Sequence, residues 1–132
     1  MPALGQTTPF IERPWNELAE VWSERAQSGW PVAHLVAIID SVIAAGAAAQ
    51  LAAASSMYDL IVVDRPIPEP PYSVVFVRSP VSVRPPPAGN VVIEHCSLTG
   101  RVDRIERPIA DAVPLFWRFM IEKFGVAPRS VR

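Results

Sequence analysis

The fold is decided by residues 91–125, VVIEHCSLTGRVDRIERPIADAVPLFWRFMIEKFG, where a strand pattern gives way to a helix pattern. Residues 91–97 and 101–107 predict two antiparallel strands, because apolar and β-branched side chains recur in both. Residues 98–100 predict the three-residue turn between them, with Gly100 in the left-handed conformation. A hairpin followed by a helix places the chain in the α+β class.

The second arm of this hairpin is charged and departs from strict alternation. Val102 and Ile105 are three positions apart, which predicts a bulge near Asp103 or exposure of one of the two apolar side chains. Arg101 and Arg104 alternate with acidic residues on the same arm. We expect this face to be exposed and to contribute specificity to any protein partner.

The helix predicted over residues 111–125 has well-marked ends. Asp111 is suited to cap its start, and Pro114 is tolerated in the first turn, where a missing amide donor costs nothing. Gly125 is suited to end it in the left-handed conformation. We therefore expect a single aromatic helix at the C-terminal end of the domain.

Apolar side chains occupy more than one stripe of this helix. The core-facing line consists of Val113, Phe116, Met120 and Phe124. Leu115, Trp117 and Ile121 point elsewhere, and burying one face of the helix cannot bury them all. We expect part of this second set to remain uncovered, and uncovered tryptophan is typical of an interface.

Two or three helices are expected before the sheet. Apolar residues at three- and four-residue steps predict a helix between Pro14 and Gly29, whose outer face carries Glu17, Glu20 and Glu24. Residues 30–45 predict a second helix, apolar nearly all round and therefore central, with a break or bend expected at Gly46. The alanine-rich residues 47–55 predict a further helix, separate from the second or continuous with it.

Short strands separated by proline-rich loops are predicted between these helices and the hairpin. Residues 60–63 predict a buried strand, 72–78 another, and 81–84 a shorter one. Prolines delimit them because proline cannot donate a hydrogen bond to a strand ladder. The predicted architecture has two layers, with the N-terminal helices and the aromatic C-terminal helix packed on a four- to five-stranded, mainly antiparallel sheet.

The length of 132 residues, half of them apolar, fits one domain with a core of its own. We assign this domain to residues 13–125. Residues 1–12 lack periodicity and are expected to form a loosely ordered arm, and residues 126–132 a flexible tail.

Charge, hydropathy and cysteine content indicate which partners and which cellular location the chain favours. Twelve basic and 13 acidic residues give a net charge of −1, which does not favour nucleic acid. Residues 32–54 are long enough to span a bilayer but contain His34, Asp40 and Gln50, so a buried helix is expected instead. Arginine and alanine richness suggests a GC-rich bacterial genome, and the single cysteine, Cys96, fits a cytoplasmic location.

Few residues offer catalytic chemistry. His34 and Ser41 are about two turns, or roughly 10 Å, apart on one helix, too far for direct proton transfer. Glu94, His95 and Cys96 are adjacent in a strand, where side chains alternate, so His95 points away from both neighbours. A dyad of His34 and Cys96 would need contact across the fold, which nothing in their spacing indicates.

Cofactor and metal signatures are lacking. The glycines are isolated, no paired His or Cys spacing suits zinc, and we therefore expect neither a metal site nor a cofactor. Arg65, Pro68 and Pro71 fit an R-x-x-P-x-x-P docking pattern, but in a proline-rich connector we interpret them as a stiff loop.

The sequence therefore favours a non-enzymatic protein-binding module: an adaptor, an inhibitor or neutraliser of another protein, or a small assembly subunit. Its partner would be another protein, a second copy of itself, or both. The residues expected to contact the partner are Leu115, Trp117, Ile121, Glu17, Glu20, Glu24, Arg101 and Arg104. The alternative is a small hydrolase-type enzyme that uses His95 or His34 with a carboxylate or Cys96.

Overall fold

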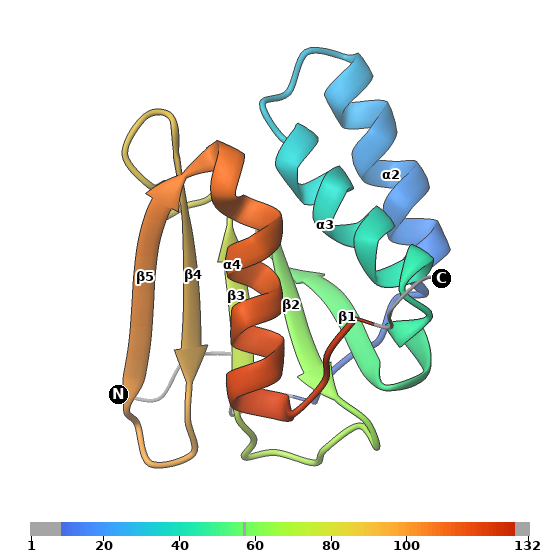
Figure 1. The fold of residues 1–132 in the computed structure, drawn as a ribbon, viewed down its shortest axis with the longest axis vertical. Coiled ribbons are helices and arrows are strands. Elements are labelled where there is room, and N and C mark those ends of the chain that lie inside the picture. Colours follow the sequence, from blue (N-terminus) through green and yellow to red (C-terminus); the bar gives the residue numbers. More distant parts are fainter. Residues whose placement is uncertain (1–8, 57, 129–132) are drawn as a thin grey trace.

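The computed structural model describes residues 9–56 and 58–128. Its centre is a five-stranded antiparallel sheet in which each strand lies beside its neighbours in the chain. The strands are β1 (Leu51–Ser56), β2 (Asp59–Asp64), β3 (Val74–Arg78), β4 (Asn90–Cys96) and β5 (Val102–Pro108). β1 and β5 form the two edges of the sheet (Figure 1).

Three helices cover one face of this sheet: α2 (Trp15–Gln27), α3 (Ala33–Ala44) and α4 (Ala112–Phe119). α3 lies between α2 and α4 (Figure 1). Short 3-10 turns, η1 (Ala47–Ala49) and η2 (Ile109–Asp111), precede β1 and α4, and a π-helical turn, η3 (Met120–Phe124), extends α4. The predicted α+β class, with helices on an antiparallel sheet, is confirmed.

Both faces of β1 to β4 are buried. The helix-facing side joins α2, α3 and α4 in one core cluster. The opposite side forms a second cluster, made of Ala52, Ala54, Ile61, Val63, Tyr72, Val74, Phe76 and Cys96. Phe10 packs against this second cluster, with its ring centroid 6.2 Å from that of Tyr72. Burial on both faces explains why β2 and β3 are apolar without alternation.

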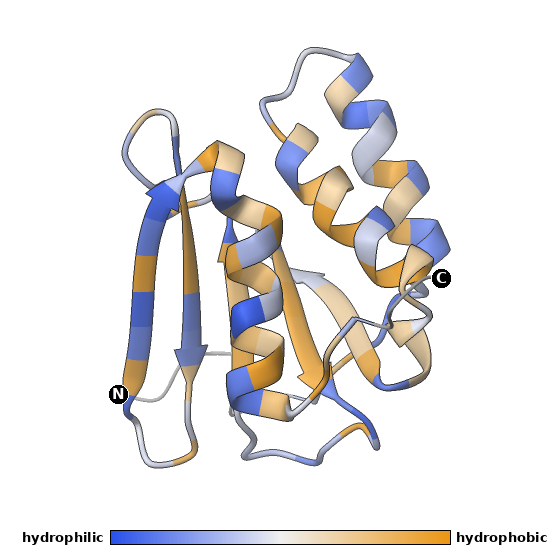
Figure 2. Ribbon diagram, viewed as in Figure 1, coloured by the Kyte–Doolittle hydropathy of each residue, from blue (hydrophilic) through white to orange (hydrophobic). Residues whose placement is uncertain are grey.

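β5 differs from the other strands because its side chains are mostly exposed or half-buried. Hydrophilic residues dominate it, whereas the inner strands are hydrophobic (Figure 2). The predicted hairpin with β4 is confirmed, and Gly100 has the expected positive φ of 86°. The register of β4 and β5 is continuous from 90↔108 to 96↔102, so the ladder has no bulge, and the irregular alternation is resolved by exposure of Val102.

Two predicted elements are wrong. The alanine-rich run is not a helix: η1 is followed by strand β1, which pairs along its whole length with β2. Small side chains fit where both faces of a strand are covered, and this packing outweighs the helix propensity of alanine. Residues 81–84 form turns and bends instead of a strand, held by Ser82, whose hydroxyl accepts a hydrogen bond from the Arg84 amide.

The ends of the helices follow the predicted signals. Pro14 precedes α2, and Gly46 follows α3 with a φ of 69°. Asp111 occupies the N-cap position of α4, although its side chain makes no capping hydrogen bond. Gly125 ends η3 with a φ of 67°.

The predicted N-terminal arm and C-terminal tail fall only partly within the described residues. Residues 1–8 and 129–132 lie outside them. Arg13 bridges the backbone of Ala53 in edge strand β1, and Val126 is buried in the helix-side core. In the described part of the chain, every helix is too short or too polar to cross a membrane.

Candidate functional site

The outer edge of β5 carries backbone groups that no described strand pairs. β4 is its one neighbour among the strands of residues 9–56 and 58–128. At one end of the hairpin the Ser97 amide donates to the Arg101 carbonyl, and just beyond the other end the Ile109 amide donates to the Gly89 carbonyl. With a continuous register, odd-numbered residues of β5 turn their backbone groups toward β4, and even-numbered ones turn theirs outward.

The outward positions are Val102, Arg104, Glu106 and Pro108. Pro108 therefore turns its backbone away from β4, and its missing N–H costs no hydrogen bond between the two strands, as expected for proline in an edge strand. The amides of Val102, Arg104 and Glu106 and the carbonyls of Val102, Arg104 and Pro108 can pair with a further strand, whereas the Glu106 carbonyl accepts a hydrogen bond from the Arg107 guanidinium.

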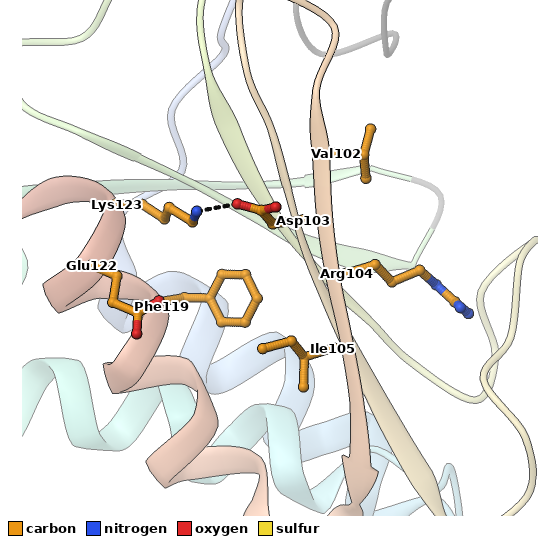
Figure 3. A pocket seen from close by; sticks show the side chains of 7 residues that line it. All are labelled: Val102, Asp103, Arg104, Ile105, Phe119, Glu122 and Lys123. Atoms are coloured by element: carbon orange, nitrogen blue, oxygen red, sulfur yellow. Dashed lines mark hydrogen bonds and ion pairs between the residues drawn. The ribbon is translucent and has the colours of Figure 1, made fainter.

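A groove runs between β5 and the end of α4, with a volume of about 330 Å³. It is lined by Val102, Asp103, Arg104, Ile105, Phe119, Glu122 and Lys123. Phe119 and Ile105 point toward each other across it, whereas Arg104 points away from the helix (Figure 3). An apolar floor next to an unpaired strand edge is suited to hold the side chains of an added extended segment.

An ion pair closes one end of the groove. The Lys123 ammonium donates to the Asp103 carboxylate (Figure 3). That hydrogen bond lowers the pKa of the Asp103 carboxyl, so this side chain is charged at neutral pH. His95 lies opposite Asp103 in the β4–β5 register, and its pKa is lowered by burial and then by the nearby Lys123 charge.

On the opposite face of the sheet, a chain of ion pairs leads from the hairpin into the core. Arg104 contacts Glu94 at 3.3 Å, Glu94 accepts a hydrogen bond from Arg78 at 3.0 Å, and Arg78 donates to Asp59 at 2.8 Å. Exposure falls along this chain, from 54% for the Arg104 side chain to 1% for that of Asp59. The Arg78 guanidinium also lies 4.5 Å from the centre of the Phe76 ring.

Asp59 organises the loop that follows β3. Its carboxylate accepts hydrogen bonds from Arg78, from the Ser79 amide at 3.1 Å and from the Ser82 hydroxyl at 2.9 Å. Burial raises the pKa of this carboxyl, and the three donors oppose that rise. With its oxygens shared among these groups, Asp59 is a structural anchor.

Arg25 lies among aromatic rings at the other end of the molecule. Its guanidinium carbon is 4.6 Å from the centre of the Trp22 ring, 5.1 Å from that of Trp30 and 5.8 Å from that of Tyr58. The rings of Trp30 and Tyr58 also contact edge to face at 5.7 Å. The chain's own guanidinium fills this cluster, which ties α2 to the β1–β2 turn.

Of the three apolar residues of which part was expected to stay uncovered, the two in α4 are buried and the one in η3 is exposed. Leu115 is 5% exposed and Trp117 is 8% exposed, whereas Ile121 is 49% exposed. The Trp117 indole donates a hydrogen bond to the Ser41 hydroxyl of α3 at 3.1 Å. α4 is covered on two sides, by the sheet and by α3, so its buried face is wider than a single stripe.

The predicted polar contact residues are exposed but lie far apart. Glu17, Glu20 and Glu24 lie on α2, and Glu17 pairs with Arg13 at 2.5 Å. Arg101 and Arg104 belong to the β4–β5 hairpin, on the other side of the fold from α2 (Figure 1). The structure therefore does not bring the predicted set together as one surface.

The candidate catalytic residues are also separated. His34 is buried in α3, and burial lowers its pKa to about 4. His95 contacts the Phe124 ring on the helix side, whereas Cys96 lies in the core cluster of the opposite face. Burial raises the pKa of the Cys96 thiol, which lies on the face of the sheet opposite α3 and the His95 side chain. The adjacent His95 and Cys96 thus form no dyad, in line with strand alternation.

Ligand-binding alternatives gain no support from the described residues. Among them, no three His, Cys, Asp or Glu side chains gather where a metal ion could bind. The Arg65 side chain of the proline motif is held within the chain, by the Glu12 carboxylate and by the Ala48 carbonyl at 3.1 Å. That arginine is therefore engaged in fixing the loop.

Sequence reasoning missed the groove and the edge position of β5. It placed Arg101 and Arg104 on an exposed face but assigned no role to Asp103, Phe119 or Lys123. The available signal was the polar, charge-alternating composition of residues 102–107, which contrasts with the apolar inner strands and is typical of an edge strand.

No family model, curated protein or solved structure matches the chain, so its function is argued from its own residues and geometry.

Proposed function

We propose that the chain is a non-enzymatic protein-binding module of the bacterial cytoplasm that accepts an extended protein segment along β5. The observation that carries this proposal is the unpaired outer edge of β5, with outward backbone groups at Val102, Arg104 and Glu106. This proposal moves the binding surface from the buried side chains of α4 to the strand beside it.

Affinity in this mode of binding comes from the backbone, and specificity from side chains. Each outward residue of β5 offers one amide and one carbonyl to the added segment. Alternate side chains of that segment would enter the groove over Phe119 and Ile105. The remaining side chains would meet Arg104 and Glu106 on the opposite face, so charge pattern would select the partner.

Site-specific photo-crosslinking in the native cytoplasm tests this proposal. A photoreactive amino acid at Val102, on the edge, is expected to capture a protein, whereas the same amino acid at Val83 is the control. Val83 is exposed but lies in the loop after β3. Replacing Glu106 with proline removes an outward amide without removing a backbone hydrogen bond to β4, although it also removes the carboxylate that accepts a hydrogen bond from the Asn90 side chain. It is expected to abolish capture at position 102.

Two results would contradict the proposal. One is capture of the same proteins from both positions. The other is capture at position 102 that survives the Glu106→Pro substitution in a folded variant, as judged by circular dichroism. Either result would show that the crosslink does not depend on strand pairing.

The alternative, a small hydrolase, is favoured by one observation: His95 lies opposite Asp103 beside the groove. Two candidate nucleophiles lie away from this pair: Cys96 faces the other side of the sheet, and the Ser41 hydroxyl bonds to Trp117 and to the Ile38 carbonyl. Hydrolysis of p-nitrophenyl acetate that depends on the imidazole of residue 95, measured with His95→Gln, would support the enzyme instead.

A further inference from the structure

We infer that the segment that fits β5 is β5 of a second copy of this chain, paired antiparallel about a twofold axis at Ile105. This inference rests on the proposed function, since it names the partner of the same edge. The two sheets would join into one continuous sheet with both helix layers on the same side.

Backbone geometry limits the registers that such a pair can adopt. Outward-turned residues must lie opposite outward-turned residues, and in β5 these are the even-numbered ones. With Ile105 on the axis, Arg104 lies opposite Glu106 of the second copy, and the two exchange both backbone hydrogen bonds. The Val102 amide then donates to the carbonyl of Pro108 in the second copy. This hydrogen bond uses only the carbonyl of Pro108, so the missing N–H of the proline does not prevent it.

The charges of β5 are complementary to themselves in this register. Arg104 lies opposite Glu106 of the second copy on one face of the sheet, and Asp103 lies opposite Arg107 on the other. The twofold axis repeats both pairs, so every charged side chain of the strand meets one of opposite sign. Opposite charges at directly facing positions of two strands stabilise their pairing.

The neighbouring registers lack this complementarity. Moving the axis to Arg104 places that residue opposite itself, and moving it to Glu106 places two glutamates opposite each other. Like charges directly opposite each other destabilise a strand pair. Charged residues normally protect a strand edge from association, and this alternation disfavours the registers on either side of the one centred on Ile105.

The exposed side chains of β5 would also find partners in the pairing centred on Ile105. The Arg107 guanidinium donates to the Glu106 carbonyl, and no described carboxylate lies within ion-pair distance of it. Asp103 of the second copy would supply that carboxylate, and the Arg107 guanidinium would then release the Glu106 carbonyl to accept the Arg104 amide. Val102, which is 53% exposed, would contact the ring of Pro108. Ile105 would meet its own copy at the axis, in a pair that exchanges no hydrogen bonds and brings side chains close.

Charge reversal with rescue by mixing tests this inference. Arg104→Glu and Glu106→Arg each place like charges opposite each other in a homodimer. Their equimolar mixture restores opposite charges in a heterodimer, because one chain carries two acidic residues and the other two basic ones. Val83→Glu, in the exposed loop after β3, is the matched control for added surface charge.

Sedimentation equilibrium over a dilution series measures the outcome. The wild type and the control are expected to dimerise with the same dissociation constant. Each single variant is expected to raise that constant about tenfold, and the mixture to return it toward the wild-type value. Circular dichroism of each variant checks that it is folded, and the mixing arm reads out pairing even if one variant is destabilised.

The outcomes separate this inference from the proposed function. A wild type that stays monomeric at every concentration, or single variants whose mixture shows no gain in association, would overturn pairing with a second copy. If crosslinking at Val102 still captured a different protein in a manner abolished by Glu106→Pro, the strand-binding function would stand with another partner. A monomer without edge-dependent capture would contradict both.

Discussion

Replacing Arg78 with methionine is expected to lower the free energy of unfolding by about 3 kcal/mol at neutral pH. The side chain is 13% exposed and bridges two carboxylates, Asp59 at 2.8 Å and Glu94 at 3.0 Å. Methionine keeps much of the volume against Phe76 but removes the charge. The loss lies at the lower end of the range for breaking a buried pair, since Ser79 and Ser82 still donate to Asp59.

The deficit of this variant is expected to shrink as the pH falls. Burial already raises the pKa of Asp59, and loss of Arg78 removes the charged donor that opposes the rise. A carboxyl whose pKa is higher in the folded chain binds more protons when folded, so it costs stability above its unfolded pKa. That cost disappears once Asp59 is protonated in both the folded and the unfolded chain. Lowering the pH therefore narrows the difference in unfolding free energy between the variant and the wild type.

Urea denaturation of both proteins at about pH 7 and about pH 4.5 measures the effect. Arg104→Met is the matched control, because Arg104 pairs with the same Glu94 but has a side chain that is 54% exposed. It is expected to lose less than about 1 kcal/mol. Equal losses in the two variants, or an Arg78→Met deficit that is the same at both pH values, would refute the reasoning.

Three other outcomes are expected. Trp117→Phe should lose about 1–2 kcal/mol of unfolding free energy, measured with urea, because it removes the hydrogen bond to Ser41 and part of a buried ring. Ile121→Ala, at an exposed position, should change it by less than about 0.5 kcal/mol. The reverse order would place Trp117 at the surface. Cys96, buried and with a raised pKa, should react with iodoacetamide only on unfolding, as followed by mass spectrometry; fast alkylation of the native chain would contradict its placement. The pKa of His34 is lowered from 6.5 to about 4 in the folded chain, so the unfolded chain binds the proton more readily. Lowering the pH from 6.5 to about 4 should therefore cost the wild type up to about 3 kcal/mol of unfolding free energy that His34→Leu does not lose. Equal pH profiles of the two proteins would show that burial of His34 does not lower stability in acid.

The parts of the fold that sequence could predict are those set by neighbouring residues. The β4–β5 hairpin follows from two short strands and a left-handed Gly100, and the helix ends follow from Pro14, Gly46 and Gly125. β1 could not be predicted, because six residues of mainly alanine and serine favour a helix or coil in isolation. Pairing with the apolar β2 makes them a strand.

The site depends on contacts between distant segments. Which strand lies at the edge is fixed by the order of the whole sheet, so the charge pattern of β5 was visible in the sequence while its unpaired backbone was not. The same reason explains the error at Trp117. Its burial depends on α3, whose Ser41 is 76 positions away in the chain. Periodicity within one helix cannot show a second neighbour.

The strand order of the sheet has a consequence for how the chain forms during synthesis. Each strand pairs with the next one along the chain, so the sheet forms between segments that are near in sequence, at a small cost in entropy. The union of α3 with α4 is the long-range step, spanning 76 positions from Ser41 to Trp117. On a ribosome α3 would emerge early, and its flank toward α4 would stay uncovered until α4 had left the exit tunnel.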